Sequence, residues 1–178
     1  MAPPPRLTLA AALFAASATL ASAAVPRCRL GRSAVNISCI AYGTLHLHEA
    51  GTPAAAAAVL QQVVALGITT IDTSDVYNSE PGLLGAALQL VPGLRQKVEI
   101  VAKMGITGAL NGYGFDSGSV FDTSCPHLNS VLATYLADLA TTYVDVLVIH
   151  REDYIMDINA LAACVQAMIA AGSVRAFG

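Results

Sequence analysis

The sequence predicts an α/β fold in which helices cover a parallel sheet. Short apolar runs with the length of buried strands occupy residues 37–41, 68–71, 98–102, 144–149 and 174–177. Segments with an apolar stripe at helical spacing separate them, at residues 53–66, 80–91, 125–139 and 158–171. Near-continuous apolar strands that alternate with one-faced helices are typical of a parallel sheet.

Composition is consistent with one folded domain. The chain has 178 residues, of which 55% are hydrophobic and 12% charged, so it can bury a core. The net charge is −3 and no basic stripe is present, which makes nucleic acid a poor candidate partner.

Residues 1–30 are predicted to be an N-terminal targeting segment, and residues 31–178 the domain. The segment contains no acidic residue, Arg6 precedes an apolar run that begins at Leu7, and small residues at 21–23 supply a cleavage position. This pattern fits a secretory signal peptide, while the Ala- and Ser-rich composition also fits an organellar transit peptide.

Three locations therefore remain open. If the segment is functional, it directs the chain to the secretory pathway or to an organelle such as a plastid. If it is not functional, the chain is cytoplasmic. The apolar run is barely long enough for an anchor helix, so stable membrane insertion is expected only if the segment is retained.

The first strand and helix have clear local signals. Residues 37–41 form an apolar run followed by Tyr42-Gly43-Thr44, which predicts a strand and a turn. Thr52 is a helix N-cap with Pro53 at the first helical position, and Gly67 ends that helix.

The later helices have similar signals. Ser79 can cap the second helix, which Pro92-Gly93 closes. Ser124 opens the third helix, and the fourth begins near Asp157 and ends at Gly172. No G-x-G-x-x-G follows the first strand, which argues against a Rossmann domain. Gly108, Gly112 and Gly114 lack the surroundings of a phosphate-binding loop, so residues 105–118 are predicted to be a flexible loop.

The four cysteines could pair in three ways if the chain is exported. Cys39 lies within an apolar run and Cys164 on an apolar helical stripe. We therefore expect both to be small buried thiols.

Ionisable residues follow three successive strands. Asp72, Lys103 and His150 each come directly after an apolar run, and Tyr77 lies just beyond the first of them. In a parallel sheet the carboxyl ends of the strands share one edge, where α/β barrels build their active sites.

This set suits proton transfer to an oxygen atom. An adjacent ammonium on Lys103 would stabilise the phenolate of Tyr77, and Asp72 would hold that ammonium in place. His150 could orient a carbonyl oxygen toward the Tyr77 hydroxyl. Such a group can protonate an oxygen as hydride reaches the neighbouring carbon.

Each residue taken alone has an ordinary structural explanation. Asp72 would cap a turn, Lys103 would be a solvated strand end, and His150 a hydrogen-bonded structural histidine. Tyr77 would be packing at the rim. The combination and its spacing favour the functional interpretation.

Two other groups of polar residues are weaker candidates. His46 and His48, with Glu49 nearby, lack a third ligand at suitable spacing, so no metal site is predicted. A carboxylate group formed by Asp75, Asp153 and Asp157 is a further possibility, but two of these residues suit turn or cap positions.

The chain from about Gly31 to Gly178 resembles the aldo-keto reductases. The stretches that carry the resemblance are AYGT, LGITTIDTSDVYNSE, LGAAL, VEIVAKMGI, LATTYVDVLVIHRED and AGSVRAFG. The resemblance implies a TIM (β/α)8-barrel type of fold and an NADPH-dependent oxidoreductase that reduces small-molecule carbonyls, aldehydes or ketones, to alcohols. It also implies that Asp72, Tyr77, Lys103 and His150 are the catalytic tetrad, with Tyr77 as the proton donor.

The resemblance also implies that only about the first half of the barrel is present, a truncated domain. The cofactor contacts expected in this half come from Gly43, Thr44 and Asp72. Five strands cannot close a barrel, so we expect open sheet edges and self-association through them. The alternative function is a non-catalytic barrel remnant that acts as a binding or interaction module.

Overall fold

The computed structural model describes residues 25–77, 81–107 and 119–178. Its centre is a five-stranded parallel sheet with the strand order β3-β4-β5-β8-β9. The strands are β3 (Ala41–Gly43), β4 (Thr70–Ser74), β5 (Glu99–Met104), β8 (Val144–Ile149) and β9 (Val174–Phe177).

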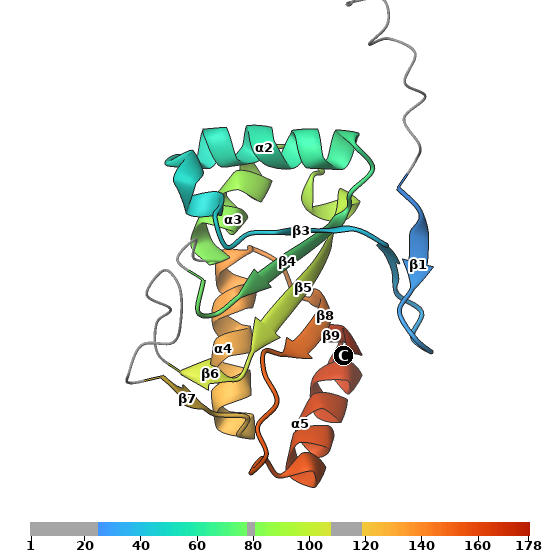
Figure 1. Ribbon diagram of the computed structural model, residues 1–178, viewed down its shortest axis with the longest axis vertical. Helices are drawn as coiled ribbons and strands as arrows, with labels where there is room; N and C mark the ends of the chain where they lie inside the picture. Colours follow the sequence, from blue (N-terminus) through green and yellow to red (C-terminus); the bar gives the residue numbers. More distant parts are fainter. Residues whose placement is uncertain (1–24, 78–80, 108–118) are drawn as a thin grey trace, which may run out of the picture.

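Four helices connect successive strands of this sheet, and in Figure 1 they surround it from α2 at the top to α5 at the lower right. The helices are α2 (Pro53–Ala65), α3 (Pro81–Leu90), α4 (Cys125–Asp138) and α5 (Ile158–Ala170). Each helix contacts the next one along the chain. Spatial order follows chain order throughout, as in a (β/α) barrel, whereas a doubly wound sheet reverses its order at a switch point. The chain therefore forms about half of a barrel, as predicted.

The helices begin where their capping signals place them. Thr52 Oγ1 accepts a hydrogen bond from the backbone N–H of Ala55, and Ser124 caps α4 in the same way. Asp157 Oδ1 accepts from two backbone N–H groups at the start of α5. The predicted cap Ser79 lies outside the described residues, as do residues 108–118 of the predicted Gly-rich loop.

The predicted strand at residues 37–41 is wrong as a single element. It divides into β2 (Asn36–Ser38), which pairs antiparallel with β1 (Arg27–Arg29), and β3, which pairs with β4. The buried hydroxyl of Ser38 accepts hydrogen bonds from the backbone N–H groups of Thr69 and Thr70. The Ser38 side chain thus takes the place of a strand's backbone carbonyl as the acceptor for Thr69 and Thr70. The polypeptide can therefore leave the β1–β2 hairpin at Ser38 and enter the parallel sheet as β3.

The β1–β2 hairpin crosses the boundary that the sequence suggests after residue 30. Residues 1–24 of the predicted targeting segment lie outside the described residues, and that boundary stays a prediction. Within the residues that the structure describes, none of the helices has the length and apolar character needed to cross a bilayer.

The expectation of free thiols at Cys39 and Cys164 is also wrong. Cys39 is bonded to Cys28 across the hairpin, and Cys164 on α5 is bonded to Cys125 at the start of α4. The Cα–Cα distances are 5.2 and 5.6 Å, within the range that a disulfide spans. Cys39 is moreover exposed, not buried as expected. Cys164 is buried on its stripe, a position that suits a half-cystine as well as a thiol, and only the packing of α4 against α5 reveals its partner.

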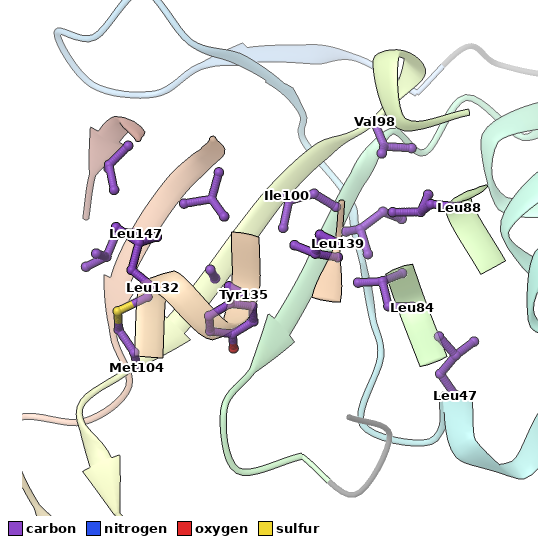
Figure 2. Packing of buried hydrophobic residues seen from close by; sticks show 14 of the residues in the cluster. Leu47, Leu84, Leu88, Val98, Ile100, Met104, Leu132, Tyr135, Leu139 and Leu147 are labelled. Carbon is purple, nitrogen blue, oxygen red and sulfur yellow. The ribbon is translucent and has the colours of Figure 1, made fainter. Parts of the chain in front are cut away.

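The hydrophobic core lies between the sheet and the helices, and Figure 2 shows its side chains packed together. Ile100 and Leu147 from the strands meet leucines from α3 and α4 there. Gly85 on α3 permits the closest approach, because a Cβ at this position would lie 1.8 Å from the backbone oxygen of Asp138 on α4. The opposite face of the sheet carries the polar residues described next.

Candidate active site

Strand alternation turns three polar side chains away from the helical layer. In β4, Asp72 and Ser74 are two residues apart and therefore point to the same face. The register of the parallel pairs places Ser74 beside Lys103 of β5. His150 follows β8 directly, and its backbone N–H donates to the Met104 carbonyl oxygen at 2.9 Å. All these residues lie at the carboxyl edge of the sheet.

Lys103 is the centre of the group. Its Nζ donates to Asp72 Oδ2 at 2.6 Å and to the hydroxyl oxygen of Tyr77. The Tyr77 hydroxyl is 3.5 Å from the same oxygen of Asp72, and the ammonium is 4.7 Å from the centre of the Tyr77 ring. The structure thus brings the predicted carboxylate, ammonium and phenol into direct contact.

The surroundings favour the charged form of Lys103. Partial burial lowers the pKa of the ammonium, but hydrogen bonds and charge attraction from Asp72 and Tyr77 raise it by more, and the net result is a raised pKa. Lys103 is therefore a permanent positive charge beside the phenol hydroxyl at neutral pH.

His150 completes the predicted set. Its ring stands edge-on to that of Tyr77, with a centroid distance of 5.9 Å and an interplanar angle of 83°. Only 11% of the His150 side chain is exposed. Its Nδ1 is 2.8 Å from the hydroxyl of Ser74, so the ring is held between β4 and Tyr77.

The two other residues predicted to contact a cofactor lie beside this group. Gly43 of β3 is in register with Asp72, and the Thr44 backbone N–H donates to the Asp72 carbonyl oxygen at 2.9 Å. A Cβ added at Gly43 would have one heavy atom within 4 Å, Asp72 Oδ2 at 3.9 Å. The space beside Gly43 is therefore open, and it borders the carboxylate of Asp72.

The candidate carboxylate group does not form as a cluster. Asp157 caps α5, and Asp153 Oδ1 accepts from the Ile155 backbone N–H within a turn. Asp75 alone reaches the site, where its Oδ1 is 3.9 Å from His150 Nδ1. His46 Nδ1 pairs with Glu49 Oε1 at 3.0 Å, at the start of the short helix that follows β3.

A cavity of about 520 Å³ lies near the opposite ends of the strands, against the β1–β2 hairpin. Its charged side chains neutralise one another: Asp145 pairs with Arg175 at 2.9 Å, and Glu99 pairs with Arg27 at 2.7 Å. A choice by size alone would make this cavity the candidate active site, but the reactive groups lie at the carboxyl edge of the sheet.

Sequence reasoning missed two residues that support the site. Ser74 contacts His150, and its place two residues after Asp72 was the signal that could have found it. Tyr135 of α4, predicted only as part of an apolar stripe, donates from its hydroxyl to the Lys103 carbonyl oxygen at 3.0 Å. That contact fixes the backbone beneath the ammonium, and no sequence pattern indicates it.

The chain is similar to proteins of one known family. Residues 39–178 match the model of the Aldo/keto reductase family. The chain is 34% identical over 148 residues to a 6-dehydroglucose reductase of Agrobacterium fabrum, which covers 81% of this chain and 50% of that protein. It is 31% identical over 159 residues to a 6-dehydroglucose reductase of Novosphingobium aromaticivorans, covering 84% and 49%.

Solved structures show the same fold. The holo form of an aldo-keto reductase from Bacillus halodurans superposes with a TM-score of 0.72 at 24% identity, over 86% of this chain and 49% of that one. A glycerol dehydrogenase from Gluconobacter oxydans gives a TM-score of 0.70 at 21% identity, over 89% and 48%. The chain spans about half the length of the relatives it matches.

Proposed function

The chain belongs to the aldo/keto reductase family, and from this premise we propose that it reduces a small-molecule carbonyl to an alcohol with Tyr77 as the proton donor. The observation that carries the proposal is the position of Lys103, whose Nζ contacts both Asp72 Oδ2 and the Tyr77 hydroxyl. That contact gives a phenol the neighbour it needs to release a proton.

Each residue has a distinct part in the proposed reaction. A bound nicotinamide cofactor, which we propose to be NADPH, supplies the hydride. Tyr77 gives its hydroxyl proton to the substrate oxygen, and the ammonium of Lys103 stabilises the phenolate that remains. Asp72 holds the ammonium at 2.6 Å and compensates for its partial burial. His150 limits the positions that the substrate oxygen can take beside Tyr77.

Gly43, Thr44 and Asp72 are the residues of this chain that we propose would hold the cofactor. Gly43 leaves room for a planar ring close to the backbone, and Asp72 borders that space. The substrate class is an aldehyde or a ketone. Because two relatives are named 6-dehydroglucose reductases, an oxidised hexose is one substrate to assay.

The test separates cofactor binding from turnover. The chain has no Trp, so binding is followed by the fluorescence of NADPH itself, with NADH titrated in parallel. Turnover is followed by loss of cofactor absorbance with an aromatic aldehyde and with 6-dehydroglucose. Tyr77→Phe should keep binding and lose turnover by roughly 100-fold or more, the range of general acid catalysis. The matched control is Tyr154→Phe, which removes a phenol that is 95% exposed.

Equal turnover by the Tyr77→Phe variant and the unmodified protein would refute the role of Tyr77. Failure of the folded protein to bind either nicotinamide cofactor would instead favour the second candidate function, a non-catalytic binding or interaction module. The observation that favours this second candidate is that β3 and β9 each pair with one strand only among the described residues.

We also propose that these two edges mediate self-association. Ile40 next to β3 is 53% exposed and Phe177 on β9 is 41% exposed, so apolar side chains accompany the unpaired backbone groups. Strands β3 and β9 are parallel, and a second copy related by a two-fold axis could pair β9 with β3 in the parallel sense.

We further propose that the chain works in an oxidising compartment, reached through the N-terminal segment. Support comes from the two disulfides, which account for all four cysteines. Such bonds persist in secretory and extracellular environments and are rare in the cytosol. A fluorescent protein fused to the C-terminus, imaged with and without residues 1–24, would test this localisation.

A further inference from the structure

A chain of three polar groups lies behind the proposed reaction centre. Ser74 Oγ is 2.8 Å from His150 Nδ1 and 3.0 Å from Asp75 Oδ1, and it also receives the backbone N–H of Val76 at 3.3 Å. Ser74 is fully buried, and the side chains of Asp75 and His150 are only 10% and 11% exposed. Water therefore has little access to these contacts.

The hydrogen bonds among Ser74, Asp75 and His150 can be arranged in only one favourable way while Asp75 is ionised. A carboxylate only accepts hydrogen bonds, so the single proton of the Ser74 hydroxyl goes to Asp75. The Ser74 oxygen then has two lone pairs to offer. The Val76 N–H uses one, and the other requires a donor on His150, which means that Nδ1 carries a proton.

The reverse arrangement is costly. If Ser74 donated to His150 Nδ1 instead, the lone pairs of Ser74 and the Asp75 carboxylate would face each other at 3.0 Å without a hydrogen. Asp75 already has one buried oxygen, Oδ2, with no hydrogen-bond partner among the described residues. Losing the Ser74 contact would leave both of its oxygens unsatisfied in a dry environment.

From this geometry we propose that Asp75, acting through Ser74, is a positioning residue that fixes His150 in the Nδ1–H tautomer. Nε2, the other ring nitrogen, has no hydrogen-bond partner among the described residues, and it is the atom left for a ligand. The neutral ring then presents a lone pair at Nε2, which can accept the hydroxyl of an alcohol. The protonated ring presents an N–H there, which can donate to a carbonyl oxygen.

The consequence for catalysis rests on the proposed function. Asp75 Oδ1 is 3.9 Å from His150 Nδ1, so its negative charge also favours a proton at that nitrogen. Lys103, on the next strand, is the cation of the same edge, and Asp72 is its ion-pair partner. In the neutral ring, the pair formed by Ser74 and Asp75 would thus leave an acceptor at Nε2 for the hydroxyl of the alcohol.

The tautomer can be measured without any cofactor. Protein labelled with ¹⁵N-histidine is studied by long-range ¹H–¹⁵N correlation at alkaline pH, and the spectrum of His150→Gln identifies the His150 signals among those of four histidines. We expect the protonated nitrogen of His150 to be Nδ1 in the unmodified chain. Ser74→Ala and Asp75→Ala, which remove the hydroxyl and its acceptor, should move the proton to Nε2, and Ser74→Thr should restore Nδ1–H because it keeps the hydroxyl.

The matched control is Glu152→Gln, which removes an exposed carboxylate two residues after His150 and should leave the tautomer unchanged. Each variant is first compared with the unmodified protein by circular dichroism, and Asp75→Ala, which leaves Ser74 in place, guards against misfolding of Ser74→Ala. An Nε2–H tautomer in the unmodified chain, or an unchanged tautomer in both variants, would overturn the proposal.

Turnover supplies the second readout. Asp75→Ala should lower kcat for alcohol oxidation roughly tenfold, less than the loss of a general acid or base, because Nε2 then carries a proton and no longer accepts the hydroxyl, with the KM for the oxidised cofactor unchanged. An unchanged kcat with a shifted tautomer would overturn the catalytic part. A chain that never binds NADPH would refute the proposed function, while the tautomer result would still decide the structural part.

Discussion

Removal of the Cys125–Cys164 disulfide is expected to lower the free energy of unfolding by about 4 kcal/mol. The two cysteines are 39 residues apart in the sequence, and the loop-closure entropy of a cross-link of that span gives this value. The Cys28–Cys39 disulfide closes only 11 residues, for which the same relation gives about 3 kcal/mol. The bond between the helices should therefore contribute more than the bond in the hairpin.

Urea unfolding, followed by circular dichroism at neutral pH, measures both contributions. The variants are Cys125→Ala with Cys164→Ala, and Cys28→Ala with Cys39→Ala. With a denaturant slope of about 2 kcal/mol per M, loss of the helix–helix bond should move the midpoint by about 2 M. The unmodified protein in a reducing agent should unfold with the midpoint of a protein that lacks both bonds.

The order of the two effects is the sharper test. Loop entropy acts on the unfolded chain, so it ranks the bonds by sequence span and not by burial. A midpoint shift below about 0.5 M for the helix pair, or a larger shift for the hairpin pair, would show that the entropic reasoning fails here. Identical midpoints in oxidising and reducing buffers would show that the disulfides do not contribute to stability.

Three further outcomes are expected. Gly85→Ala should destabilise the fold by about 1–3 kcal/mol in the same urea assay, because its Cβ would overlap the backbone of Asp138, and equal midpoints would contradict this close contact. Burial, and secondly the negative charges nearby, raise the pKa of Tyr135 well above its ordinary 10.0. At high pH the folded state therefore binds more protons than the unfolded state, so the free energy of unfolding falls as pH rises above 10. Tyr135→Phe should be less stable by about 1 kcal/mol near neutral pH, where it lacks one hydrogen bond, and should lose less stability above pH 10; parallel stability curves would refute this. Light scattering coupled to size exclusion should show concentration-dependent dimers that Phe177→Lys and Ile40→Lys together convert to monomers, and a monomer at every concentration would contradict association through the edges.

The sequence predicts elements that local chemistry determines. Thr52 and Ser124 begin their helices as predicted because an N-cap acts within its own turn. The strand at residues 144–149 is found at its predicted bounds because it is apolar apart from Asp145, whose buried carboxylate pairs with Arg95 and Arg175. Topology then follows, since alternating strands and helices leave few arrangements that bury both.

The same local reasoning fails where a distant partner decides. The apolar run at residues 37–41 has the composition of one strand, yet the hydroxyl of Ser38 pairs with backbone groups 31 and 32 residues away and divides it. Cys164 lies on a buried stripe whether or not it is oxidised, and its partner on α4 becomes visible only when the helices pack. Long-range contacts of this kind leave no periodic signal in the sequence.

The candidate site shows both behaviours, and the difference follows from strand geometry. Asp72, Lys103 and His150 could be placed together because each was predicted to follow a strand directly, and the ends of parallel strands meet at one edge. In the structure β4 continues past Asp72 to Ser74, with Asp75 directly after it, so position alone does not distinguish a residue that touches substrate from one that holds a neighbour. Only the contact from Ser74 to His150, 76 residues away, makes that distinction.

Because the tetrad comes from the central strands β4, β5 and β8, its geometry does not depend on either open edge, and changes at Ile40 or Phe177 should alter association without moving the tetrad.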